Sequence, residues 1–140
     1  MSSEVSESLR QTIAERANYC CEYCLLPQSV ALHKHETDHI VPIQHGGETN
    51  EDNLALSCMR CNRHKGPNVG SFDRATGNLV PFYNPRQHHW ADHFVLDEAI
   101  IQPLTAEARV TVRILGINSE ERIRERQLLL KAELYGNIRS

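Results

Sequence analysis

The sequence has few aromatic side chains and no long apolar run. Aromatic residues make up 6% of the 140 positions and hydrophobic residues 40%, so a core can form but holds few large rings. Small domains with a limited core commonly depend on a staple such as a bound metal. No run approaches the roughly 18 apolar residues that a membrane-spanning helix requires, so we expect no membrane segment. The length suits one compact domain, or a small domain with an extension.

The chain also lacks an excess of positive charge. Its 15 Lys and Arg are outnumbered by 18 Asp and Glu, which gives a formal net charge of −3. This balance argues against a protein that coats nucleic acid, because such proteins are usually basic. A local basic strip can still coexist with an acidic average. The candidate strip is Arg60, Arg63 and Lys65, followed further along by Arg74 and Arg86.

An apolar leader is missing as well. The segment 1–16 is polar and amphipathic and lacks the apolar centre of a signal peptide. We therefore expect a cytoplasmic protein. In such a reducing compartment, paired cysteines bind metal ions more often than they form disulfides.

Hydrophobic patterning predicts a mixture of helices and short extended segments. Apolar residues recur every fourth position from Val5 to Ala17, which favours a helix over 4–17. Further along we expect an extended segment at 35–42, a short helix at 58–65, a hairpin at 70–85, and helices at 105–115 and 118–135. The segment 105–115 also alternates like a strand, but Thr105 could cap a helix there.

The last predicted helix has its own start signal. Asn118 and Glu121 are spaced like a capping box, in which the first side chain caps the helix. Gly116 would end the helix before it.

Four of the five cysteines form two C-x-x-C pairs. They are Cys21, Cys24, Cys58 and Cys61. Two intervening residues let both thiolates of a pair point at one ion, and two pairs supply four soft ligands in tetrahedral geometry. The pattern therefore predicts a closed structural zinc site. Because 34 positions separate Cys24 from Cys58, something substantial is inserted between the pairs.

Other interpretations of these cysteines stay open. A redox dithiol would explain one pair but leave the other without a role, and the pairing could also be accidental. The fifth cysteine, Cys20, could in principle replace Cys21, although the spacing to Cys24 favours Cys21. We interpret Cys20 as a small buried residue.

The insert carries further motifs in a definite order. They are Asp38-His39-Ile40-Val41-Pro42, Gly46-Gly47 and Asn53-Leu54, with Asn62 and Lys65 following the second cysteine pair. Together with the cysteines, this arrangement resembles the HNH nuclease family and its β-β-α-metal motif. The likeness spans residues 21–65 and combines six elements in family-like order. It implies an α+β fold with a β-β-α-metal core, zinc knuckles, an N-terminal helix and a helical C-terminal extension.

The resemblance also suggests a division of the chain into three parts of one compact domain. A helix within 1–19 would pack on a nuclease core at 20–68, and 69–140 would form an extension of a hairpin and helices. Stretches between Phe72 and Phe94 are similar to the extension of some bacterial, notably cyanobacterial, HNH proteins, so we expect the bacterial cytosol. We interpret the extension as a packing layer over the core.

The resemblance assigns a role to each polar residue of the motif. Hydrolysis of a phosphodiester needs a deprotonated water, and a neutral imidazole is a suitable base near pH 7. The implied general base is His39, and the implied metal ligand is the neighbouring Asp38. Asn53 would fix the loop and orient His39. Adjacent residues of an extended segment point to opposite sides, so Asp38 and His39 would have different surroundings.

Asn62 stands where the family often has histidine, and it would be the second ligand of the catalytic ion. Aspartate with asparagine offers oxygen ligands, which favour Mg²⁺ or Mn²⁺. His64 is a rival ligand, but two positions from Asn62 on a helix it would face elsewhere. Lys65 shares the face of Asn62 and could meet a substrate phosphate or developing charge.

We therefore expect a metal-dependent endonuclease acting on double-stranded DNA, with zinc as the structural ion and Mg²⁺ or Mn²⁺ as the catalytic ion. Contacts with nucleic acid would come from Arg60, Arg63, Lys65 and Arg86. Two alternatives stay open: a zinc-stabilised nucleic-acid-binding module without catalysis, and an interaction domain that uses the C-terminal helix.

Histidines outside the motif are interpreted as packing or surface residues. His89 and His93 are spaced i and i+4, close to His88, and could share a metal on a helix. Packing is the favoured interpretation. The remaining loop histidines, His33, His35 and His45, are expected on the surface, although His45 could line the cleft.

Overall fold

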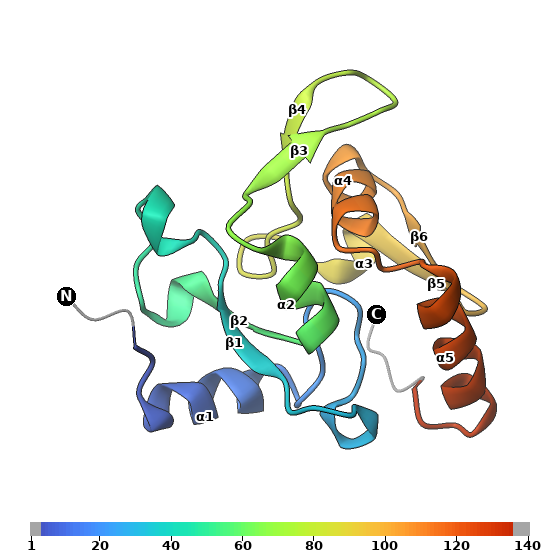
Figure 1. Cartoon of the computed structure of the whole chain (residues 1–140), viewed down its shortest axis with the longest axis horizontal. Coiled ribbons are helices and arrows are strands. Elements are labelled where there is room, and N and C mark those ends of the chain that lie inside the picture. The colour runs from blue at the N-terminus through green and yellow to red at the C-terminus, as the bar shows by residue number, and fades with distance from the viewer. Residues whose placement is uncertain (1–3, 136–140) are drawn as a thin grey trace.

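A computed structural model describes residues 4–135 and has a mixed α+β architecture, which confirms the predicted class (Figure 1). Its elements are α1 (Glu7–Arg16), β1 (Glu36–His39), β2 (Leu54–Ser57), α2 (Met59–Lys65), β3 (Gly70–Phe72), β4 (Leu79–Pro81), α3 (Trp90–His93), β5 (Phe94–Asp97), β6 (Ile100–Pro103), α4 (Ala106–Ile114) and α5 (Glu120–Lys131). The strands pair in three two-stranded antiparallel sheets. None of the described helices has the length and apolar character needed to cross a membrane.

The hairpin β1–β2 and the following helix α2 lie at the centre of the chain. The antiparallel register places Asp38 opposite Ala55. All of β2 is buried, including its one polar residue, Ser57. α2 begins directly after β2, because the Cys58 side chain caps the helix by accepting from the backbone N–H of Cys61.

Helix α1 packs on the same hairpin. Ser6 caps it through its side chain. On the face that the fourfold spacing predicts, Ile13 and Ala17 are buried in one cluster with Leu54 and Leu56 of β2. This contact ties the N-terminal helix to the strands that carry the candidate site.

Within the described residues, the segment 70–135 forms two further hairpins and three α-helices. β3 and β4 form the predicted hairpin. Thr105 caps α4 by accepting from the N–H of Ala108, so the helix interpretation of 105–115 is confirmed. The hairpin β5–β6 was not predicted, because its strands follow α3 directly and are joined by only two residues.

The predicted cap of the last helix is wrong. Ser119, not Asn118, caps α5 by accepting from the N–H of Arg122. The Asn118 side chain instead bonds both the backbone N–H and the backbone C=O of Ile101 on β6. A long-range contact therefore replaces the local capping box.

The largest hydrophobic cluster joins the cysteines to the C-terminal elements. Its buried members are Cys21, Tyr23, Cys24, Cys58, Cys61, Phe82, Tyr83, Phe94, Ile101, Ala108, Val110, Leu115 and Ile117. The cysteine segments and the extension therefore share one core. The apolar side chains of each segment are buried by contact with the other. The division at residues 19 and 68 remains a prediction.

Candidate metal centre and active site

The four predicted cysteines converge on one point. Each offers a sulfur, and all four sulfurs lie within 4.8 Å of one another. The four residues are buried. In each pair, the backbone N–H of the second cysteine is directed at the sulfur of the first, at 3.5 Å. Cys20 lies outside this cluster and is half-buried, not buried as expected.

A structural metal such as zinc fits this donor set. Four thiolates held by a buried core supply a closed tetrahedral set of soft ligands. In the described part of the chain the cysteines form no disulfide, so the sulfurs are available as ligands. When bound, such an ion would replace repulsion among four buried sulfurs by coordinate bonds, and binding would contribute to folding.

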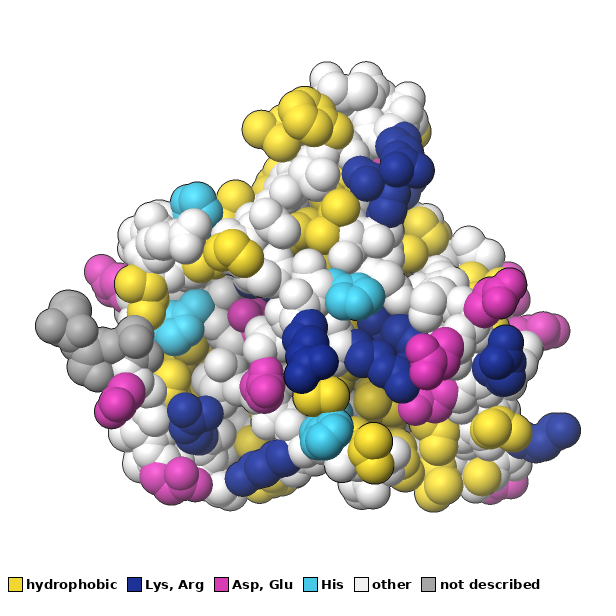
Figure 2. Space-filling view, viewed as in Figure 1, with side chains coloured by type: hydrophobic (Ala, Val, Ile, Leu, Met, Phe, Trp, Pro, Cys, Tyr) yellow, Lys and Arg dark blue, Asp and Glu magenta, His cyan; other side chains and the backbone are white. Residues whose placement is uncertain are grey.

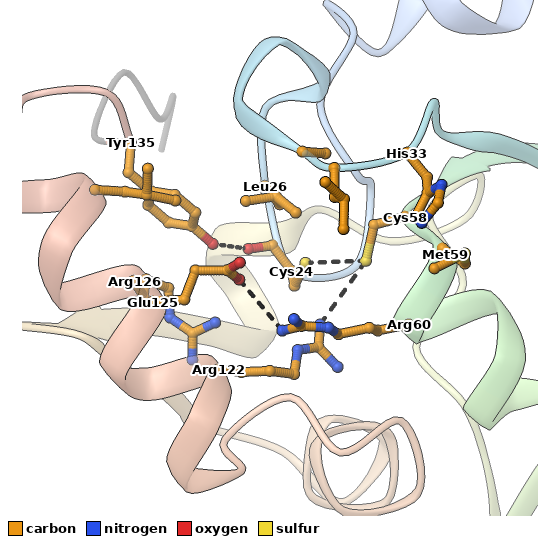
Figure 3. Close-up of a pocket in the computed structure, with 13 residues that line it drawn as sticks. Cys24, Leu26, His33, Cys58, Met59, Arg60, Arg122, Glu125, Arg126 and Tyr135 are labelled. Atoms are coloured by element: carbon orange, nitrogen blue, oxygen red, sulfur yellow. Dashed lines mark hydrogen bonds and ion pairs between the residues drawn. The ribbon is translucent and has the colours of Figure 1, made fainter.

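A buried arginine from the C-terminal helix completes the cluster (Figure 3). Arg122 of α5 is only 4% exposed, and its guanidinium donates to the sulfur of Cys61 at 3.1 Å and of Cys58 at 3.9 Å. A further donation reaches the backbone oxygen of Leu115 at 2.8 Å. Four thiolates around a divalent ion leave two negative charges in the core, and burying such charge is costly unless a cation pairs with it.

We expect Arg122→Met to weaken metal retention. Loss of the only cation that bonds the sulfurs in the described structure should lower zinc affinity by about 10- to 100-fold, the range seen for outer-shell partners. The measurement is zinc transfer to a chromogenic chelator. The matched control is Arg126→Met, because Arg126 is equally buried on α5 but donates to the backbone oxygens of Ala99 and Ile117. Equal zinc loss by both variants would contradict a specific role for Arg122.

The second group of predicted residues begins on β1. Asp38 is buried, whereas His39 is partly exposed, so the two side chains have the different surroundings predicted for neighbours on a strand. Tyr23, which lies between Cys21 and Cys24, donates its hydroxyl to Asp38 Oδ2 at 3.1 Å. This hydrogen bond joins the segment of the first cysteine pair to the candidate active site.

Lys65 lies beneath β1, in contrast to the expected contact with substrate. Its side chain is 1% exposed, and its ammonium lies 3.3 Å from Asp38 Oδ2. The same ammonium donates to the backbone oxygens of His39 at 3.0 Å and Ile40 at 3.2 Å. Burial raises the pKa of Asp38, and the adjacent Lys65 cation opposes that effect. Lys65 therefore holds the strand and its carboxylate in place.

His39 is held by a residue that the sequence did not single out. Its Nε2 lies 2.9 Å from the hydroxyl of Thr49, while Nδ1 has no hydrogen-bond partner within residues 4–135. Partial burial lowers the pKa of His39, and the Asp38 carboxylate works in the opposite direction. A lowered pKa favours the neutral imidazole near pH 7, the form that can accept a proton.

Asn53 fixes the loop between the strands, as predicted, but without touching the imidazole. Its side chain accepts from the N–H of Val41 at 2.9 Å and donates to the backbone oxygens of Val41 and Glu48. The second glycine of the motif, Gly47, has no room for a side chain. A Cβ there would lie 1.7 Å from the Val41 oxygen and 2.8 Å from Asn53 Nδ2. The loop that carries Thr49 is thereby set against β1.

Asn62 lies near Asp38 in space. Both residues, together with His39, line one open depression between β1 and α2. Asn62 donates its amide to Glu36, and both contacts of Asp38 involve Oδ2. Asn62 Oδ1 and Asp38 Oδ1 thus keep no protein partner within the described ranges. One carboxylate oxygen and one amide oxygen form a hard donor pair suited to Mg²⁺ or Mn²⁺.

The predicted basic strip is only partly available for nucleic acid. Arg60 is 3.3 Å from Glu125 and 3.7 Å from Glu121, so its charge is balanced. Arg86 pairs with Glu22 and is largely buried. Arg63 is exposed and forms no ion pair with any described residue. Among Arg60, Arg63, Lys65 and Arg86, only Arg63 is therefore exposed without an ion pair to a described residue, because acidic residues distant in sequence pair with the other three.

Of the histidines outside the motif, His33, His45 and His89 are exposed. His35 is buried against the backbone oxygen of Leu26, so its expected surface position is wrong. His88 and His93 have ring centroids 4.7 Å apart and both lie against Tyr83. His93 Nδ1 is 2.6 Å from the hydroxyl of Thr105. α3 has a single turn, and His89 is its N-cap, so the alternative of an i, i+4 metal pair on one helix face does not form.

Comparison with known proteins agrees with this geometry. Residues 21–68 match the sequence model of a family described as HNH endonuclease. The match contains both cysteine pairs and the depression with Asp38, His39 and Asn62. No curated protein and no solved structure matches the chain.

Proposed function

We propose that this protein is a metal-dependent endonuclease that hydrolyses phosphodiester bonds in double-stranded DNA, because residues 21–68 match the sequence model of the HNH endonuclease family. The family match supports nuclease-type chemistry. The active state, the substrate and the residue roles are our proposal, with cytoplasmic action expected from the sequence.

One observation carries the proposal: three polar atoms without a partner among residues 4–135 belong to side chains that line one depression. They are Nδ1 of His39, Oδ1 of Asp38 and Oδ1 of Asn62. In each case the other polar atom of the side chain is held by a neighbour, which fixes the orientation. A base and two oxygen ligands on one open surface suit a phosphodiester, which a closed pocket would exclude.

His39 is the proposed general base. Its Nδ1 accepts a proton from a water molecule, while the Thr49 hydroxyl holds Nε2. The hydroxide attacks phosphorus, the bond from phosphorus to the leaving oxygen breaks, and that oxygen takes up a proton from solvent. A divalent ion held by Asp38 and Asn62 would neutralise charge on the phosphate and the leaving oxygen. Asn53 and Lys65 keep β1 and its loop in position.

The test is nicking of supercoiled plasmid in a series of Mg²⁺, Mn²⁺ and chelator. We expect His39→Ala to lose about 10²- to 10⁴-fold in rate, the usual contribution of a general base. His89→Ala is the matched control, because His89 is exposed and lies at the start of α3, away from the depression.

Two results would count against the proposal. Equal nicking by wild type and His39→Ala would remove the role given to His39. Salt-sensitive binding without cleavage in any metal would favour the nucleic-acid-binding module that lacks catalysis.

A further inference from the structure

The hairpin β3–β4 projects from the body of the molecule, above α2 (Figure 1). Phe72 and Leu79 are directly paired across it, so their side chains lie on the same face. They are 61% and 69% exposed. Figure 2 shows hydrophobic side chains on one side of this projection and basic side chains beside it. An exposed aromatic and an exposed leucine side by side commonly mark a contact surface.

Side chains of α4 bond the base of the hairpin. Asp73, buried at the start of its loop, accepts two hydrogen bonds from Arg109 of α4, at 3.0 and 2.9 Å, and one from the Thr76 hydroxyl. Arg113 donates to the backbone oxygen of Phe72. The apolar pair is therefore presented by a rigid support.

The exposed tip carries positive charge only. Arg74 is exposed and forms no ion pair with any residue from 4 to 135. The single acid between Gly70 and Pro81 is Asp73, whose charge is balanced by Arg109. A cation next to an apolar pair, with no exposed carboxylate in the hairpin, complements a polyanion whose bases have stacking faces.

The hairpin is also continuous with the candidate active site. One apolar groove is lined by Val80 and Pro81 of β4 and by Ile40 and Val41, the two residues that follow His39. A ligand long enough to span this groove would contact both the depression and the hairpin.

We propose that the β3–β4 hairpin is a second contact with duplex nucleic acid, in which Phe72 and Leu79 insert as an apolar wedge against a base step and Arg74 binds a phosphate. The proposal rests on the proposed function. Apolar wedges of this kind unstack bases in the minor groove, and arginine favours its narrow, negative surface.

The test measures duplex binding and base stacking in full-length, zinc-loaded His39→Ala protein. The probe is a 30-base-pair DNA with two labels. The fluorescence of 2-aminopurine rises when its base is unstacked, and the anisotropy of fluorescein reports binding. We expect Phe72→Ala with Leu79→Ala to weaken binding by about tenfold and to remove the rise in 2-aminopurine fluorescence. Arg74→Gln should weaken binding and reduce its salt dependence. The control is Val95→Ala with Leu104→Ala, which truncates exposed apolar residues outside this hairpin.

The outcomes separate this proposal from the proposed function. If wild type cleaves plasmid but the hairpin variants bind with unchanged affinity, the hairpin contact is wrong and the nuclease stands. If wild type neither binds nor cleaves nucleic acid, both are wrong. A wild-type dimer in sedimentation that Phe72→Ala converts to monomer, with unchanged DNA affinity, would assign the hairpin to self-association and overturn the proposal.

Discussion

Cys24→Ser is expected to release the structural metal and to unfold the protein. Cys24 is 1% exposed, and its sulfur belongs to the four that lie within 4.8 Å of one another. A serine hydroxyl is a poor replacement for a thiolate toward zinc, and three ligands would remain. The effect should be large because the cysteines belong to the same core cluster as Phe94 and Ile101 of the extension. When metal binding and folding are coupled, losing the metal costs the free energy of folding.

Zinc content by mass spectrometry of metals and thermal unfolding by circular dichroism test this expectation. We expect less than stoichiometric zinc and no cooperative transition for Cys24→Ser. Cys20→Ser is the control, since Cys20 lies next to the pair but outside the sulfur cluster. A zinc-free Cys24→Ser protein that unfolds like wild type would contradict the four-cysteine site.

Local motifs predicted the frame of this molecule well. The cysteine spacing specified which sulfurs converge, and the insert between the pairs contains the strands and loop that the motif order implied. Such patterns succeed because each joins residues a few positions apart, whose geometry is determined by short segments of backbone. Thr105 at the start of α4 is a further case, in which one hydroxyl and one N–H decide the outcome.

Residues that act across the chain could not be predicted in the same way. Arg122 reaches a sulfur 61 positions away, and in sequence it is one of many charged residues on a polar helix. Its only signal is its place on the buried side of α5, which cannot be recognised until the packing partner is known. Asn118 shows the converse, because a contact with Ile101 overrides a good capping pattern.

Lys65 illustrates why a motif position does not reveal its physical role. In sequence it follows Asn62 by three positions on one helix, which suggested a shared face and a contact with a substrate phosphate or developing charge. The ammonium instead points beneath β1, where three oxygens surround it. A long side chain at the end of α2 can reach a neighbouring strand, and that reach depends on tertiary packing.

We therefore expect Lys65→Met to destabilise the fold strongly. Removing the ammonium would leave the buried Asp38 carboxylate without its cation and the oxygens of His39 and Ile40 without that donor. Breaking a buried ion pair by removing one partner typically costs about 3–5 kcal/mol. Urea unfolding measures this loss. Arg63→Met is the matched control, because Arg63 is on the same helix but exposed; its unfolding should stay within about 0.5 kcal/mol of wild type.

A double variant separates the structural role of Lys65 from a substrate contact. Asp38→Asn combined with Lys65→Met removes both charges, so part of the stability lost in Lys65→Met should return, since the unpaired buried carboxylate is gone. A substrate contact predicts the opposite pattern: Lys65→Met would unfold like wild type and only weaken cleavage or DNA affinity. Lys65 is 1% exposed, and its ammonium donates to the backbone oxygens of His39 and Ile40. The structure therefore favours loss of stability as the primary effect. Any loss of cleavage would then follow from displacement of His39.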